Sequence, residues 1–412
     1  MFRQLRPPTV RTYVESDDVD NARRGLFIAK VFFFCYYGSI GTLAPFLNVY
    51  LEQIGLNGVQ IGWIGSIPPL IALVANPLWG TISDRWQIHR LVLATLTFMG
   101  GLVSLLFLTS ISFWAILLFT VLMTFFRRPI GSILDGAAVA IVKQTGDTYG
   151  RQRLWGSLGF VTVSYGLGWI LTGRDLTYAF WFHALLLAGV CTVVSLRLPI
   201  AGGKERVNIL AGLKQLGKES TYRYFLASVA LIGMGMAGYI GFLSLYMIDL
   251  GGGAQELGLL WVAVGIMEVP VMYFGARRLE RYSYQTVLRF SMLGFMLGWL
   301  LMAFANSPLY LCLNVLIISS SYACYWVSVV NYASESAPKG LSATAQALIG
   351  AAQGGLGWSI GSVVAGYLWD ASGGTALYLF SATAAFVAVV SFWWGNREYC
   401  NGKPDGGDMA NG

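Results

Sequence analysis

Charged residues are scarce in this chain of 412 residues: they make up 11% of it, whereas a soluble domain carries roughly 25%. Hydrophobic residues make up 56%. So few charged side chains could not cover the surface of a soluble protein of this length. The composition therefore excludes an ordinary soluble enzyme and indicates a protein that is surrounded by lipid.

Residues that bind metals or form disulfides are also few. The two histidines, His89 and His183, are far apart in the chain, and the five cysteines show no C-x-x-C spacing. We therefore expect no metal site, no disulfide framework and no cofactor. The polar segment 1–24 lacks the short apolar core and the small-residue cleavage site of a signal peptide, and we expect it to be a cytoplasmic tail.

Long apolar runs are what the sequence has in abundance. A helix that spans a membrane needs about 20 mostly apolar residues. The segments that meet this requirement cover 25–51, 59–82, 91–109, 113–142, 153–173, 176–198, 224–249, 255–277, 285–305, 308–334, 342–369 and 375–395. The sequence therefore predicts an all-α membrane protein of twelve transmembrane helices.

Lysine and arginine are distributed very unevenly among the predicted loops. If the amino terminus is cytoplasmic, the outside loops hold a single basic residue, Arg174, and the inside loops hold the others. Basic residues concentrate on the cytoplasmic side of membrane proteins, so we expect both termini in the cytoplasm and the chain in the plasma (inner) membrane. The net charge of +7 reflects this bias and does not indicate a nucleic-acid partner.

The longest inside loop divides the chain near its midpoint. We predict a tail at 1–24, a six-helix bundle at 25–198, a central loop at 199–223, a second six-helix bundle at 224–395 and a second tail at 396–412.

The two predicted bundles share a sequence pattern. Residues 61–85 align with 257–281, so that a helix in each half ends in an acidic and a basic residue, Asp84-Arg85 in one and Glu280-Arg281 in the other. Such an internal repeat predicts two pseudo-symmetric bundles.

Residues 80–85 read Gly-Thr-Ile-Ser-Asp-Arg, which resembles the G-x-x-x-D-R loop signature of the major facilitator transporters. In that family the loop latches the two halves together by charge pairing at helix ends. The resemblance implies that Gly80, Asp84 and Arg85 form such a latch, and the repeat extends it to Glu280 and Arg281. The second glycine and the basic doublet of the signature are missing here, which implies a looser latch.

Residues 149–157 read Tyr-Gly-Arg-Gln-Arg-Leu-Trp-Gly-Ser and resemble the start of the fifth helix in the lactose permease and phenylpropionate permease branch of that family. The resemblance implies that Asp135 and Arg153 grip the substrate and that Phe160 stacks on it. It also implies that Glu268 links the substrate site to the proton site.

The resemblance to lactose permease itself stops at the tenth helix. Val315, Ile318 and Ser321 stand where lactose permease carries its lysine, histidine and glutamate. Proton coupling of the lactose type is therefore not implied. The phenylpropionate permeases are more similar, because their fourth helix likewise reads Phe-Phe-x-Pro and then reaches an aspartate, as residues 125–135 do here.

Ionisable residues within the predicted spans point to function without any resemblance. Each costs at least about 2.5–3.5 kcal/mol to insert at mid-membrane, and the mid-span examples are Arg127, Arg128, Asp135 and Glu268. Arg128 and Asp135 lie about 20° apart around a helix and roughly 10 Å apart along it, which leaves room for a substrate between them. The alternative is a buried ion-pair network that only ties helices together.

Glu268 has no cation near it in sequence, and an apolar setting favours the protonated form of a carboxyl group. We predict that Glu268, together with Asp135, carries the coupled proton. Tyr36 in the first helix and Tyr325 in the tenth are placed to stack on a substrate ring.

These patterns predict a monomeric secondary transporter that moves a small solute by alternating access. The solute is an organic or aromatic acid or a sugar, and proton symport is the first hypothesis. Efflux by proton antiport is the alternative, as is a membrane sensor with the same fold. An intramembrane enzyme is not favoured, because His183 has no serine or cysteine partner in sequence.

Overall fold

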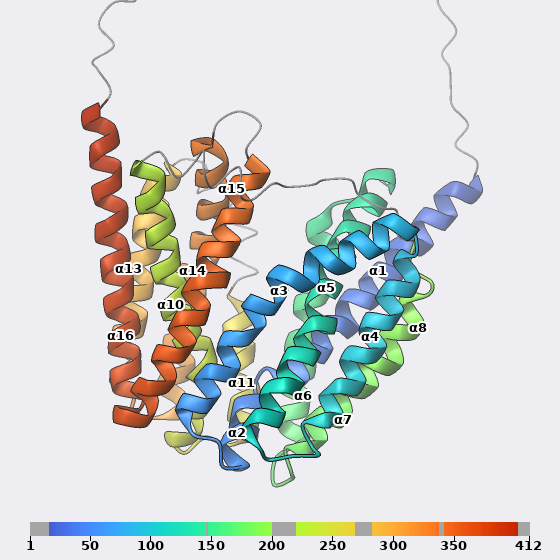
Figure 1. The fold of residues 1–412 in the computed structure, drawn as a ribbon, viewed down its shortest axis with the longest axis horizontal. Coiled ribbons are helices and arrows are strands. Elements are labelled where there is room, and N and C mark those ends of the chain that lie inside the picture. Colours follow the sequence, from blue (N-terminus) through green and yellow to red (C-terminus); the bar gives the residue numbers. More distant parts are fainter. Residues whose placement is uncertain (1–15, 146, 200–219, 268–281, 338–341, 403–412) are drawn as a thin grey trace, which may run out of the picture.

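The computed structural model describes residues 16–145, 147–199, 220–267, 282–337 and 342–402. They form helices joined by short turns. The predicted all-α architecture of two helix bundles is confirmed, and Figure 1 shows the bundles side by side.

The first bundle holds six crossings. They are α1 (Ser16–Leu43) with the short α2 (Leu47–Gln53), α3 (Gly58–Trp86), α4 (His89–Leu106), α5 (Phe113–Thr145), α6 (Tyr149–Ile170), and α7 (Thr177–Ala184) continued by the π-helix η1 (Leu185–Cys191) and α8 (Thr192–Ser195).

The second bundle has the same plan. Its elements are α10 (Ser220–Asp249), α11 (Ala254–Ile266), α13 (Tyr284–Met302), α14 (Pro308–Ser336), α15 (Ser342–Ile349) continued by the π-helix η2 (Gly350–Gly357), and α16 (Trp358–Gly402).

Within the described ranges, nine helices are long and apolar enough to span a membrane. The last of these bends at Gly373, whose φ of 68° and ψ of −161° lie outside the helical region, so it holds two crossings. The remaining two are α6, whose sequence is more polar, and α11, of which 13 residues are described. The predicted twelve crossings follow from these elements.

The molecule has two distinguishable ends. We call the end where α1 begins and α16 finishes the terminal end, and the opposite end, where α2 and the turn at Gly251 lie, the loop end (Figure 1). The two bundles meet toward the loop end and splay apart toward the terminal end.

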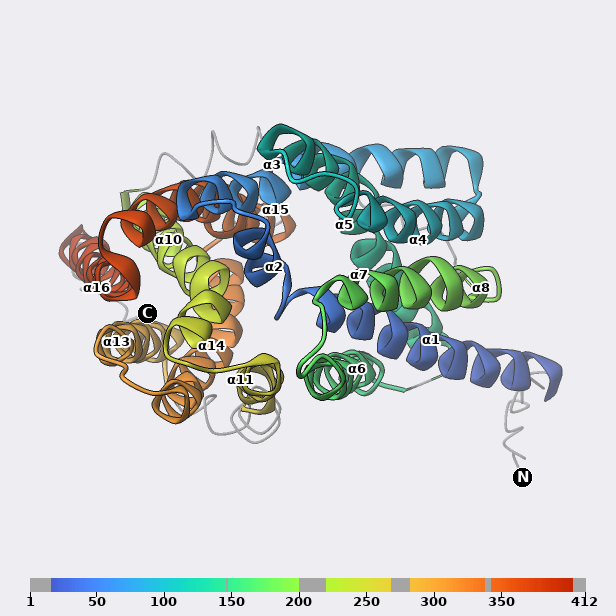
Figure 2. The same cartoon turned by 90° about the horizontal axis from the view of Figure 1, so that it is seen from below.

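Two helix pairs join the bundles. The helices α3 and α16 pack together, and so do α6 and α11, as the view along the bundles in Figure 2 shows. Small residues make this packing close: a Cβ on Gly168 would lie 2.6 Å from the carbonyl oxygen of Ala254. Such glycines let helix backbones approach each other.

A close helix contact inside the first bundle gives a stability prediction. A Cβ on Gly159 of α6 would collide with the carbonyl oxygen of Phe34 on α1, whereas a Cβ on Gly166 of α6 would meet no atom within 4 Å. We expect Gly159→Ala to destabilise the bundle by about 1–3 kcal/mol, and Gly166→Ala to have little effect. Thermal unfolding of the detergent-purified variants measures both, and equal melting temperatures would contradict the prediction.

Candidate functional site

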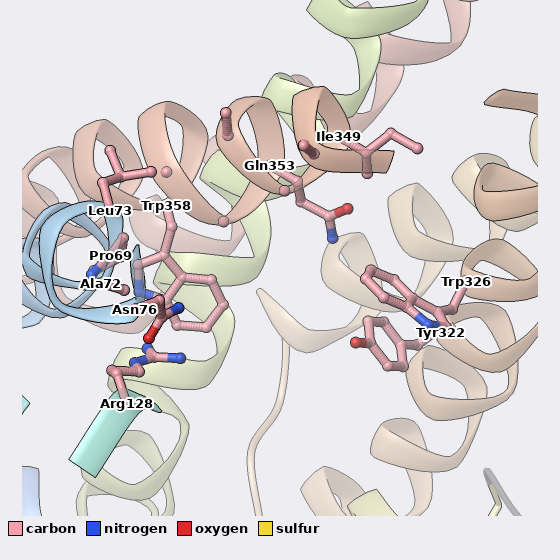
Figure 3. Close-up of a pocket in the computed structure, with 15 residues that line it drawn as sticks. Pro69, Ala72, Leu73, Asn76, Arg128, Tyr322, Trp326, Ile349, Gln353 and Trp358 are labelled. Carbon is pink, nitrogen blue, oxygen red and sulfur yellow. The ribbon is translucent and has the colours of Figure 1, made fainter. Parts of the chain in front are cut away.

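A cavity of about 530 Å³ lies between the two bundles. Its walls come from α3 and α5 of the first bundle and from α14, α15, η2 and α16 of the second (Figure 3). The lining side chains that Figure 3 labels are Pro69, Ala72, Leu73, Asn76, Arg128, Tyr322, Trp326, Ile349, Gln353 and Trp358. This volume is in the usual range for a small-molecule site.

Arg128 is the charged residue of the cavity wall, and it is exposed there. Among the described residues Arg151 pairs with Asp147 and His89 lies near Asp84, so no described carboxylate neutralises the guanidinium of Arg128. A cation at this depth in a membrane is costly unless it faces a partner or a wet cavity. Arg128 is therefore placed to bind a polar or anionic solute.

Asn76 lies beside Arg128 in Figure 3, and its Oδ1 is buried without a hydrogen-bond partner among the described residues. Buried polar atoms are nearly always hydrogen-bonded in folded proteins. An open acceptor next to an arginine that no described carboxylate pairs with suits a ligand that both donates and accepts hydrogen bonds.

Asp135 and Arg153 do not form a direct ion pair in this structure. The hydroxyl group of Tyr149 donates to Asp135 Oδ1 at 2.8 Å. The guanidinium of Arg153 lies over the ring of Tyr37, 3.8 Å from its centroid, in a cation–π contact. One nitrogen of Arg153, Nη1, is buried and has no partner in the described part of the chain. Neither Asp135 nor Arg153 is among the residues that line the cavity.

Arg128 and Asp135 are not paired either, although α5 carries both. Seven residues along one helix place the two side chains too far apart for a tight direct pair. The first bundle therefore holds a charged cluster in which the arginines keep unused hydrogen-bonding capacity and Asp135 is held by a neutral tyrosine.

The three predicted aromatic contacts lie in different places. Tyr36 is buried in the first bundle, where its hydroxyl group donates to the carbonyl oxygen of Arg127 at 3.3 Å. Phe160 meets Trp261 across the two bundles, with ring centroids 5.9 Å apart. Tyr325 is fully buried in the second bundle. That all three bind substrate stays a prediction.

Three predicted residues, Glu268, Glu280 and Arg281, lie outside the described residues. The described part of the predicted latch sits at the terminal end of α3. There Oδ1 of Asp84 lies 3.8 Å from Nδ1 of His89, the first residue of α4, and Arg85 is exposed. A Cβ on Gly80 would meet no atom of a described residue within 4 Å, so no described part of the second bundle packs against this point.

At the loop end, polar contacts join the two bundles. The carboxylate of Asp370 on α16 accepts hydrogen bonds from the backbone amides of Gly58 at 2.7 Å and Val59 at 2.8 Å, which open α3. Asn48 donates to the carbonyl oxygen of Gly241 at 2.6 Å, and Ser359 donates to that of Ser66 at 2.9 Å.

These contacts lie on one side of the cavity. Along α3 they involve residues 58–66, whereas the cavity is lined by residues 69–76. Along α16 the contacts involve Ser359 and Asp370, which come after Trp358, the last residue of that helix in the cavity wall. The cavity is therefore closed toward the loop end, while the bundles diverge toward the terminal end (Figure 1).

The reasoning from sequence did not select Asn76 or Gln353. Both are uncharged amides within apolar spans, in Ala-Asn-Pro and in the glycine-rich run at 350–357. A polar amide inside a predicted membrane helix is itself a signal of a helix contact or a ligand site, and it could have identified both residues.

A helical membrane protein with two bundles and a cavity between them has the architecture of a major facilitator transporter. The model of the MFS_1 like family matches residues 26–380, and the chain belongs to this family. The resemblance seen in the loop and helix motifs is thereby confirmed, and the protein is a membrane transporter rather than an enzyme.

Two relatives and one solved structure extend the comparison. The chain is 29% identical to the maltose permease of Geobacillus stearothermophilus over 373 residues, which is 90% of this chain and 93% of the permease. It is 25% identical to the probable 3-phenylpropionic acid transporter of Escherichia coli (strain K12) over 366 residues, or 85% and 93% of the two chains. The crystal structure of the nucleoside transporter NupG matches with a TM-score of 0.81 at 17% identity, covering 90% of this chain and 99% of that one. This structural match confirms the fold.

Proposed function

We propose that the protein is a secondary active transporter that couples uptake of a small sugar or organic acid to proton symport by alternating access. The observation that carries the proposal is Arg128, which lines a cavity between two bundles and has no ion pair with a described residue. A fixed positive charge attracts the oxygen atoms of hydroxyl-rich or anionic solutes. The names of the maltose and phenylpropionic acid relatives support these two classes.

In this proposal the structure represents the inward-facing state. The cavity is closed at the loop end by contacts of Asp370 and Asn48, and both described chain ends lie at the other end. The terminal end faces the cytoplasm, and the transporter sits as a monomer in the plasma (inner) membrane. Engagement of Asp84 and Arg85 with the second bundle belongs to the outward-facing state.

The predicted residues of both bundles belong to the proposed site, although of these Arg128 alone lines the cavity in this state. In the proposal Arg128 binds the solute together with Asp135 and Arg153, and Tyr36, Phe160 and Tyr325 come close to it as the bundles move between states. Asp135 shares the coupled proton with Glu268. A carboxylate held by the hydroxyl group of Tyr149 can change partner at little cost, because a neutral hydrogen bond to a carboxylate is weaker than an ion pair with a guanidinium at close range.

The proposal is tested with purified protein in liposomes that contain a pH-sensitive dye. Maltose, 3-phenylpropionate and uridine are added outside in separate assays. Symport predicts acidification of the interior by the transported solute, whereas antiport predicts that the interior becomes alkaline. Solute entry without any pH change would overturn proton coupling and retain the transporter.

Glu268→Gln gives a second prediction for the same assay. The substituted amide cannot carry a proton, so we expect proton flux to vanish while labelled solute still exchanges across the membrane. Glu335→Gln in α14, a residue that does not line the cavity, serves as the matched control and should keep wild-type flux. Proton flux that survives in Glu268→Gln would remove the coupling role from this residue.

A further inference from the structure

Gln353 occupies an unusual stretch of helix. The π-helix η2 covers Gly350–Gly357 and lines the cavity. π-Helical turns are rare and occur frequently at functional sites. Gln353 is 8% exposed, and Figure 3 shows its amide pointing from η2 into the cavity. Among the described residues of the second bundle, Gln353 is the one that brings a side-chain amide to the cavity wall.

The orientation of this amide is set by a residue behind it. Tyr325 is fully buried on α14, and its hydroxyl group donates to Gln353 Oε1 at 3.2 Å. The ring of Tyr325 packs against Phe295, with centroids 5.5 Å apart. The hydroxyl hydrogen is thereby directed at the amide oxygen, and the amide nitrogen faces away from Tyr325.

The amide nitrogen Nε2 of Gln353 has no acceptor among the described residues. This donor is open to the cavity, where a ligand oxygen would accept its hydrogen bond. Gln353 therefore presents a fixed hydrogen-bond donor to whatever occupies the cavity.

The opposite wall also presents donors. Arg128 comes from α5 of the first bundle, across the cavity from Gln353 in Figure 3. The rings of Tyr322 and Trp326 stack with centroids 6.2 Å apart and an interplanar angle of 22°, and they form an aromatic wall beside this space. Such a cavity fits a ring-containing solute that carries acceptor oxygens at both ends.

We propose that Gln353 is a specificity-determining residue and that Tyr325 is the positioning residue that fixes its amide. Together they select solutes with acceptor oxygens at both ends, of the disaccharide class, against arylalkanoates, whose far end is a hydrocarbon ring. A hydrocarbon end leaves the Gln353 donor unpaired, and an unpaired polar group in the site is what rejects a ligand. This inference rests on the proposed transport function, because it assigns the substrate class of the same cavity.

The test compares two probes, maltose and 3-phenylpropionate, on the purified full-length protein. Affinity is measured by calorimetry and transport by counterflow in liposomes. We expect the wild type to bind maltose at least about tenfold more tightly than 3-phenylpropionate. In Gln353→Leu maltose affinity should fall about tenfold, the worth of a typical hydrogen bond, while 3-phenylpropionate affinity stays level or rises.

Tyr325→Phe separates positioning from packing. It keeps the ring and removes the hydroxyl group, so we expect a higher KM for maltose, an unchanged maximal rate, and no further loss when it is combined with Gln353→Leu. Tyr310→Phe is the matched control, because Tyr310 lies on the same helix and its hydroxyl group donates to a backbone carbonyl, that of Leu301, at 3.2 Å.

Each other result has a defined meaning. Equal loss of affinity for both probes in Gln353→Leu would overturn the inference and assign Gln353 to packing. Failure of the wild type to bind either probe, or a preference for 3-phenylpropionate, would also overturn it. Selective maltose binding that depends on Gln353, without counterflow, would uphold the specificity assignment and remove the proposed transport of this solute.

Discussion

Arg128→Gln is expected to lower solute counterflow about 100-fold while leaving the thermal stability of the protein unchanged. The guanidinium of Arg128 has no ion pair with a described residue and lies exposed in the cavity wall. The fold therefore does not depend on its charge. A charge-assisted hydrogen bond contributes about 1.5–3 kcal/mol, which corresponds to a factor of about 10 to 150 in affinity.

The comparison needs an arginine whose loss has no effect on transport. Arg151→Gln serves, because Arg151 is exposed at the start of α6 and pairs with Asp147 at 3.5 Å, four residues away on the surface. Arg128→Lys should be intermediate, since lysine keeps the charge but loses the planar fork. A melting temperature that falls in Arg128→Gln as steeply as transport does would instead identify Arg128 as a structural residue.

The bundle architecture could be predicted because the membrane imposes it through composition and length. Apolar runs of about 20 residues and the placement of basic residues are local properties that need no knowledge of packing. The span of α6 is the weakest case. Its sequence from Tyr149 to Ile170 does not reach the hydropathy of the nine long apolar spans, although the apolar run at 153–173 predicted it.

The site was only partly predictable for a physical reason. Charge makes a residue conspicuous inside an apolar span, and Arg128 was found in this way. Which partner a charge selects depends on how neighbouring helices are rotated, and sequence does not report rotation. The structure accordingly gives Asp135 the hydroxyl group of Tyr149 and gives Arg153 the ring of Tyr37.

Uncharged residues of the cavity had a weaker signal. The direction of the Gln353 side chain depends on the π-helical stretch η2. The wider turn of a π-helix leaves no pattern that can be recognised in a glycine-rich sequence. Asp370 lies just beyond the predicted span 342–369, where it reads as an ordinary loop carboxylate. Its role in joining the bundles depends on the backbone amides of Gly58 and Val59, which lie more than 300 residues earlier in the chain.

Asp370→Ala is expected to shift the equilibrium between the two states of the transporter toward the outward-open one. The carboxylate of Asp370 on α16 caps the amino terminus of α3 through two hydrogen bonds of 2.7 and 2.8 Å. An anion at a helix amino terminus satisfies free amides and interacts favourably with the helix dipole. Because the two helices belong to different bundles, this cap stabilises only the state in which the loop end is closed.

The size of the shift follows from the same contact. Losing a charge-assisted cap at a surface where water can replace it costs about 0.5–2 kcal/mol, so the population ratio should change about 2- to 30-fold. Spin labels at Ile111 and Leu309, exposed residues near the loop-end turns of opposite bundles, report the opening as a longer distance in a background whose native cysteines are replaced by alanine.

Asp175→Ala distinguishes the loss of a contact between the two bundles from the loss of a helix cap within one bundle. Asp175 accepts a hydrogen bond from the amide of Thr177 at 2.8 Å, so it makes the same kind of contact at the same end of the molecule but within one bundle. Its removal should leave the label distance unchanged. If Asp370→Ala also left the distance distribution unchanged, the closed loop end would be held by the tight packing of α3 on α16 and of α6 on α11, and the cap would contribute to local helix stability alone.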